Sequence, residues 1–175
     1  MLRVALLACL ALAPRAGATT LERLSQDQLI QKSNLIVRCK AISSSSTLRG
    51  RIIFTVHRLQ VIESLKGTVP ATLEVSVPGG ELNGMRQTFP GAPQMSGGQE
   101  YVAFIWTSAR GVNQIIGLHQ GLFDVKSVSG SLVISRGISD AEMVDRDGRT
   151  VADAPVSMRL DDLRTRVRRQ ESVRQ

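Results

Sequence analysis

The chain has 175 residues, 42% of them hydrophobic and 3% aromatic, with a formal net charge of +7. This length is enough for one domain with a substantial core and requires no second domain. The charge favours anionic partners but is far below that of a dedicated polycation, which excludes that class of protein.

Residues 1–18 have the features of a secretory signal peptide. Arg3 supplies the positive n-region, residues 4–13 form an apolar h-region, Pro14 breaks it, and residues 16–18 offer an Ala-x-Ala cleavage site. An apolar run of about ten residues is too short to cross a bilayer as a helix, which needs roughly twenty. The sequence therefore predicts an exported protein, periplasmic or extracellular, that does not span the membrane.

A lipoprotein signal is the alternative interpretation of this segment, because Cys9 follows the apolar residues 6–8. Almost no h-region precedes that cysteine, so cleavage after Ala18 is favoured. Loss of residues 1–18 leaves 20 basic and 15 acidic residues, a formal charge of +5.

Cys39 is then the one remaining cysteine, so no disulfide can form within the mature chain. A zinc-cysteine cluster is excluded as well, because such a site needs several soft ligands. Cys39 shares one strand face with Leu35, Val37 and Ala41, which predicts a small buried apolar residue. The alternatives are a thiol nucleophile and a disulfide between two chains.

The first elements after the cleavage site are a short helix and two strands. Ser25 and Gln28 form a capping box, which predicts a helix over residues 25–32. Residues 35–43 form the first strand, and a polar turn over residues 43–50 leads into a second strand over residues 51–62. The apolar phase changes in this second strand, and we expect a β-bulge at His57 and Arg58.

Leu73, Val75 and Val77 predict a third strand, which Pro78 and the following glycines end. Residues 79–99 are rich in glycine and proline, with a short strand at residues 85–89. Long loops on a rigid scaffold are frequent binding sites. The candidate ligand-binding residues in this region are Glu81, Asn83, Arg86, Gln94 and Gln99.

The remaining strands are expected at residues 101–106 and 113–118, followed by two hairpins. Their turns are Ser129 with Gly130 and Asp147 with Gly148. A final amphipathic helix is expected to be capped by Ser157, and its apolar residues are Leu160, Leu163 and Val167.

Short strands separated by turns at this spacing indicate a mainly β protein, a small barrel or sandwich with a short N-terminal and a C-terminal amphipathic helix. We divide the chain into a signal peptide at residues 1–18, a β-rich domain at 19–156 and a basic helix with tail at 157–175.

The sequence lacks the recurrent motifs of catalysis and cofactor binding. His57 and His119 lack the spacing of a metalloprotease, and the chain contains no nucleophile elbow, P-loop or dinucleotide fingerprint. Residues 143–154 resemble part of a calcium loop, but Met143 and Ala154 occupy the positions of essential acidic ligands. We therefore predict no catalytic residues, no metal site and no cofactor.

Three segments carry a resemblance to known proteins. Residues 33–37, 61–67 and 97–104 resemble a pattern seen in small exported bacterial proteins of unknown function, a similarity over roughly residues 20–135. It implies bacterial export. More loosely, a bent strand that ends in Leu-Lys-Gly at residues 65–67 is similar to the netrin and metalloproteinase-inhibitor module, which implies an OB-like barrel. That module relies on disulfides and its inhibitors on an N-terminal cysteine, whereas the first mature residue here is Thr19, so that inhibition is not carried over.

The predicted function is an exported, non-catalytic binding module whose partner is an unknown protein or envelope component. The first alternative is an envelope enzyme, a hydrolase or thiol enzyme that uses Cys39 and His57. The second is peripheral binding to an anionic surface through Arg164, Arg166, Arg168 and Arg169. Nucleic acid is not expected, because the few aromatic residues mostly fall in core-like strands and form no stacking platform.

Overall fold

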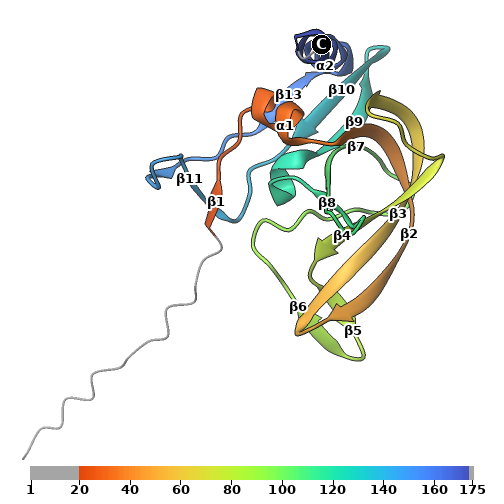
Figure 1. Cartoon of the computed structure of the whole chain (residues 1–175), viewed down its shortest axis with the longest axis vertical. Coiled ribbons are helices and arrows are strands. Elements are labelled where there is room, and N and C mark those ends of the chain that lie inside the picture. Colours follow the sequence, from red (N-terminus) through yellow and green to blue (C-terminus); the bar gives the residue numbers. More distant parts are fainter. Residues whose placement is uncertain (1–19, 174–175) are drawn as a thin grey trace, which may run out of the picture.

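The computed structural model describes residues 20–173, and their framework is one large antiparallel sheet (Figure 1). Its strands lie in the order β13-β10-β9-β7-β2-β3-β4, with β8 also paired to β7. Two small sheets, β1-β11-β12 and β5-β6, are attached to it. The elements are β1 (Thr20–Glu22), α1 (Gln26–Lys32), β2 (Leu35–Arg49), β3 (Ile52–Lys66), β4 (Thr72–Pro78), β5 (Gly80–Leu82), β6 (Met85–Gln87), β7 (Glu100–Thr107), β8 (Asn113–Ile115), η1 (Leu118–Gly121), β9 (Leu122–Val128), β10 (Ser131–Arg136), β11 (Glu142–Val144), β12 (Thr150–Val151), β13 (Val156–Arg159) and α2 (Leu160–Ser172). The mainly β class with two α-helices is confirmed, and the predicted signal peptide lies outside the described residues.

The large sheet buries apolar side chains on both of its faces. The helix-side core packs under α1 and α2 and contains Leu24, Leu29, Ile30, Ile36, Val102, Phe104, Ile116, Phe123, Ile134, Leu160, Leu163 and Val167. The strand-side core lies on the other face and contains Val37, Cys39, Ala41, Leu59, Leu73, Val75, Val77, Tyr101, Ala103, Ile105, Ile115 and Leu122. Neighbouring residues of one strand enter different cores because side chains alternate between the two faces.

Strands β2 and β3 form a long hairpin, and two predictions about it are wrong. The serines at residues 43–46 are not a turn, because they pair with β3 and the strand continues to Arg49. No bulge lies at His57 and Arg58; the ladder instead skips Ile42 of β2, between Ala41 and Ser43, and Ile62 and Leu65 of β3. The phase of β3 does not change at His57, since Ile53, His57 and Leu59 are all buried at odd positions.

The capping box of α1 is confirmed in both of its hydrogen bonds. The Gln28 backbone N–H donates to Ser25 Oγ at 3.2 Å, and the Ser25 backbone N–H donates to Gln28 Oε1 at 2.7 Å. Leu24 and Leu29 on either side of the cap both enter the helix-side core. The local sequence therefore fixes where this helix starts and which side it buries.

Helix α2 begins later than predicted. Ser157 pairs with Ser135 inside β13, so it does not cap the helix, and the N-cap residue is Arg159. The expected apolar positions Leu160, Leu163 and Val167 are fully buried in the helix-side core. The turns at Ser129 with Gly130 and Asp147 with Gly148 are both found where expected.

A buried ion pair joins β10 to the segment before β13. Arg136 donates to Asp153 at 3.0 and 3.2 Å, and the two side chains are 5% and 3% exposed. Burial raises the pKa of Asp153, but hydrogen bonds from Arg136 and from the Ser139 and Ala154 backbones outweigh it, and the pKa lies below its usual value.

Replacing Asp153 with alanine leaves the Arg136 charge buried without its partner. We expect this to lower the free energy of unfolding by about 3–5 kcal/mol, measured by urea denaturation. Asp147→Ala is the matched control, because it removes an exposed ion pair with Arg149 and should cost less than about 1 kcal/mol. Equal losses in the two variants would contradict a special role for the buried pair.

Acid should weaken the protein through the same carboxylate. Because its folded pKa is lowered, Asp153 contributes stability above the unfolded pKa of about 3.9, and this contribution is lost as pH falls through the folded pKa. Asp153→Asn removes that component, so its unfolding free energy should fall less steeply below about pH 5.

Candidate functional site

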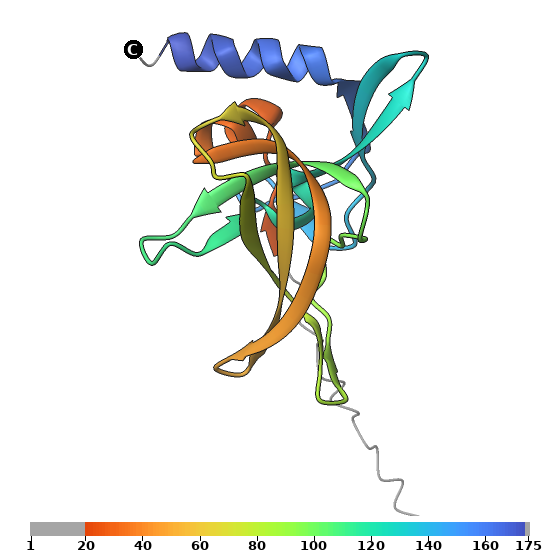
Figure 2. The ribbon, with the colours of Figure 1, turned by 90° about the vertical axis from the view of Figure 1, so that its right-hand side faces the viewer.

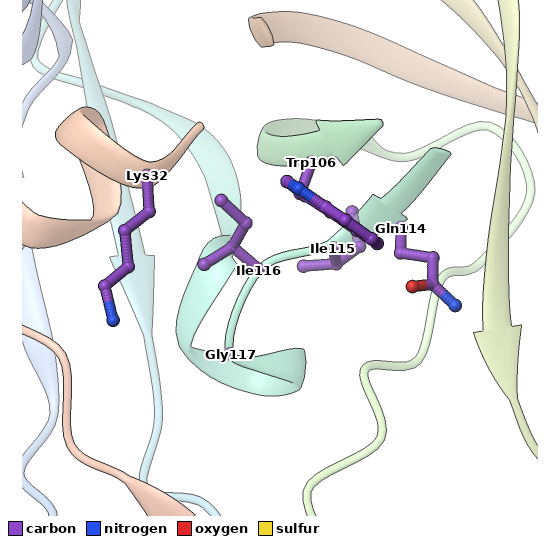
Figure 3. A pocket seen from close by; sticks show the side chains of 6 residues that line it. All are labelled: Lys32, Trp106, Gln114, Ile115, Ile116 and Gly117. Atoms are coloured by element: carbon purple, nitrogen blue, oxygen red, sulfur yellow. The ribbon is translucent and has the colours of Figure 1, made fainter. Parts of the chain in front are cut away.

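A surface depression surrounds the exposed indole ring of Trp106 (Figure 3). We call it the Trp106 depression, and it is lined by Lys32, Trp106, Gln114, Ile115, Ile116 and Gly117. Its volume is about 480 Å³, within the range of small-ligand sites. The Trp106 side chain is 45% exposed, although the sequence places it in an apolar strand and predicts a core-like residue.

The end of α1 explains why Trp106 is left uncovered. Trp106 and Phe104 lie on the same face of β7, and Phe104 is buried in the helix-side core under the helices. Helix α1 stops at Lys32, and the Asn34 side chain then accepts a hydrogen bond from the Thr107 backbone N–H at 2.8 Å. The helical layer therefore ends just before it reaches Trp106.

The polar edge of the depression comes from two elements. Gln114 of β8 is the cross-strand partner of Trp106, so the amide and the indole share one face of the sheet. Lys32 stands on the opposite side (Figure 3) and forms an exposed ion pair of 3.6 Å with Glu22. A ligand here would meet an aromatic face, an amide and an ammonium group.

The floor of the depression is held by a buried glutamine. Gly117 and Leu118 both have left-handed backbones, with φ of 60° and 53°. Behind them Gln120 is fully buried; its Oε1 accepts from the Leu24 backbone N–H at 2.8 Å and its Nε2 donates to the Glu22 carbonyl at 2.9 Å. A Cβ at Gly117 would lie 3.1 Å from that amide nitrogen, so the turn is closely packed.

A second depression of about 250 Å³ adjoins the first, because both are lined by Gln114 and Ile115. It lies between β4 and β8, and its other lining residues are Phe54, Ser76, Val77, Pro78, Pro93 and Leu118. The short strand β8 therefore contributes Gln114 and Ile115 to the walls of both depressions.

The residues predicted for ligand binding fall in two places, and none of them lines the Trp106 depression. Glu81, Asn83 and Arg86 lie on the β5–β6 hairpin, where Glu81 and Arg86 form an exposed ion pair of 3.6 Å. Gln94 and Gln99 are exposed in the loop that follows. Pro93 is the contribution of that loop to the second depression.

Trp106 was missed because its surroundings depend on where α1 ends. The sequence shows a tryptophan at the end of a strongly apolar strand, just before a polar turn. That position is one signal that separates it from Phe104, which lies deeper in the same strand.

Cys39 and His57 do not form a pair. Cys39 is opposite Val61 and His57 is opposite Ser44, so four residues of β3, about 13 Å of strand, separate the two positions. Burial, with the nearby Glu100 charge, raises the pKa of Cys39 to about 12, and its thiol donates to the Tyr101 carbonyl at 3.7 Å. Burial also lowers the pKa of His57 below its usual value. A protonated thiol is a poor nucleophile.

The C-terminal arginines differ in their surroundings. Arg164 donates to both carboxylate oxygens of Glu63 in β3 at 2.6 and 2.8 Å and also to Asp161, so its charge is already paired. Arg166, Arg168 and Arg169 are exposed on α2.

Within residues 20–173, no group of three or more His, Cys, Asp or Glu side chains is arranged to hold a metal ion. No helix in this range combines the length and the apolar character needed to cross a membrane. Comparison of the sequence with models of known protein families gives no match, and comparison with curated proteins gives none.

The burial of Cys39 predicts that its thiol is inert in the folded protein. In a Cys9→Ser background, iodoacetamide at pH 8 should leave Cys39 unmodified for hours and should label it rapidly in urea, measured by mass spectrometry. Fast modification of the folded chain would contradict the conclusion that the Cys39 thiol is buried and protonated. It would support the alternative hypothesis of a thiol enzyme.

Proposed function

We propose that this protein is an exported, non-catalytic binding module and that its ligand occupies the Trp106 depression. The observation that carries the proposal is a half-exposed tryptophan held over a packed floor beside an amide and an ammonium group. Exposed aromatic anchors with a polar rim are typical of binding sites.

The lining indicates the chemistry of the ligand. The indole offers a flat apolar face, Gln114 offers a donor and an acceptor, and Lys32 favours a negative or carbonyl group. An envelope component with a flat apolar ring and a polar or anionic edge combines these features. Burial of the indole against such a ring would supply most of the affinity, and the polar groups would orient it.

We also infer a small OB-like barrel as the scaffold of this site. Strand β2 pairs with β3 and β7, β3 pairs with β4, and β7 pairs with β8, all antiparallel, so β8 runs parallel to β4. The Asn113 side chain donates to the Glu74 carbonyl at 3.0 Å, which links the two ends of this five-strand set. In OB-like barrels the loop between the fourth and fifth strands contributes to binding, and Trp106 lies beside the corresponding loop.

Export is the second part of the proposal, and bacterial origin goes with it. It rests on the signal-like sequence of residues 1–18 and on the resemblance to small exported bacterial proteins. Mass spectrometry of the chain isolated from an exporting bacterium should find Thr19 as the first residue. Retention of Met1 in the cytoplasm would contradict export and leave the binding site untouched.

Trp106 reports on its own site, because it is the one tryptophan in the sequence. Its fluorescence in the free protein should be quenched by acrylamide, and fractions of an envelope extract that contain the ligand should protect it. Trp106→Ala should lower the affinity for the purified ligand by at least about tenfold, since truncating an aromatic anchor at a binding hot spot costs about 2 kcal/mol or more.

Val128→Ser is the matched control, because Val128 is an equally exposed apolar residue on β9. This variant should bind as the native chain does. Loss of binding in both variants, or in neither, would contradict the assignment of the ligand to the Trp106 depression.

A further inference from the structure

Two hairpin tips lie side by side at the end of the molecule opposite α2 (Figures 1 and 2). They are the tip of the β2–β3 hairpin, residues 47–53, and the β5–β6 hairpin, residues 80–87. We call them the paired tips. Both project from the body of the molecule in both views.

The side chain of Gln87 joins the two hairpins. Its Oε1 accepts from the Ile53 backbone N–H at 2.7 Å, and its Nε2 donates to the Arg51 carbonyl at 2.9 Å. At the base of the β5–β6 hairpin, the Thr55 hydroxyl donates to the Gly79 carbonyl at 2.8 Å. The two tips therefore behave as one structural unit.

The paired tips expose large apolar side chains from both hairpins. Leu48, Ile52 and Met85 are 48%, 38% and 55% exposed. Leu48 and Ile52 lie next to the turn at Gly50, and Met85 lies next to the turn at Gly84. Apolar residues that project from a hairpin tip contribute nothing to the core, so burying them in a partner gains free energy at no cost to the fold.

Cationic side chains surround these apolar groups. Arg49, Arg51 and Arg86 are exposed, and the one acidic residue in the sequence of the paired tips is Glu81. The Arg49 guanidinium lies 5.4 Å from the centre of the Phe54 ring, which holds it beside the tip. Apolar residues bordered by arginines are complementary to an anionic bilayer, which offers hydrocarbon beneath phosphate groups.

We propose that the paired tips are a docking surface for an anionic phospholipid bilayer. Leu48, Ile52 and Met85 enter the interfacial layer, and the three arginines contact lipid phosphates. This surface is separate from the Trp106 depression and does not depend on the ligand proposed there.

Helix α2 is the competing surface, and the structure disfavours it. Its apolar residues are already buried in the helix-side core, and Arg164 is paired with Glu63 and Asp161. Beside its cations it has one projecting apolar residue, Val173, which is 82% exposed directly after the last turn, whereas the paired tips project three. Because α2 and the paired tips lie at opposite ends (Figure 2), a flat membrane contacts one or the other.

The test places an environment-sensitive NBD label on each end in a Cys9→Ser background, at Met85→Cys or at Arg168→Cys. Vesicles are made of equal parts phosphatidylglycerol and phosphatidylcholine, or of phosphatidylcholine alone. We expect the label at position 85 to shift to the blue and to be quenched by lipid-borne quenchers in the anionic vesicles, and the label at position 168 to remain unchanged. No response at position 85, or a response at position 168 alone, would overturn the proposal.

Charge variants test the electrostatic part in both directions. Each arginine near an anionic surface contributes about fivefold to affinity, so Arg49→Gln, Arg51→Gln and Arg86→Gln together should weaken vesicle binding by about a hundredfold. Glu81→Gln should strengthen it, by about fivefold. Unchanged affinity in the triple variant would overturn the proposal, provided that its thermal unfolding matches the native chain.

Leu48→Ser with Ile52→Ser tests the apolar part and should lower affinity by at least about tenfold. Ile138→Ser is the matched control, since Ile138 is 63% exposed away from the paired tips, and it should bind normally. Equal effects of the two changes would contradict insertion of the tips.

Discussion

The first part of strand β2 has to bury both of its faces at once. Ile36 enters the helix-side core and Val37 the strand-side core, and neither is exposed to solvent. Strands β3 and β7 cover the two edges of β2, so its backbone is paired on both sides. The helices α1 and α2 cover one face of β2, and β4 and β8 cover the other. The need to cover both faces therefore fixes where the helices lie and where the Trp106 depression is left open. Cys39 is buried for the same reason, because it fills part of the strand-side core. That burial raises the pKa of its thiol, which stays protonated.

That constraint ends near Ala41, where the molecule changes character. Pairing with β7 stops at Lys40, Ile42 is skipped in the ladder to β3, and the remaining residues of β2 pair with β3. Beyond this point no described strand pairs with the other edge of β2. The hairpin therefore projects and exposes its tip (Figure 2). Gln87 at the end of β6 joins the β5–β6 hairpin to this projecting hairpin through its side-chain hydrogen bonds to Ile53 and Arg51. The base of one hairpin is thus a core element, and its end becomes the proposed membrane surface.

Local interactions were predictable from the sequence, and long-range ones were not. The Ser25 capping box and the turn at Gly130 depend on residues a few positions apart, and both were predicted. Ser157 looked like a helix cap because the sequence does not reveal that β10 recruits it as a strand partner. The exposure of Trp106 likewise depends on where α1 stops, a contact between distant segments. Glu81 and Arg86 lie in the segment predicted as a loop, but they are paired across the β5–β6 hairpin, and their place beside the β2–β3 tip depends on Gln87.

We propose that recognition involves exposed side chains at strand ends and that the buried thiol and imidazole are structural. Backbone and indole NMR spectra of the isotopically labelled protein, recorded with and without a bacterial envelope extract, test this most directly. The account predicts that the Trp106 indole resonance and the amides of residues 113–117 shift as extract is added, while those of Cys39 and His57 do not. Shifts centred on Cys39 and His57, with Trp106 unchanged, would contradict it.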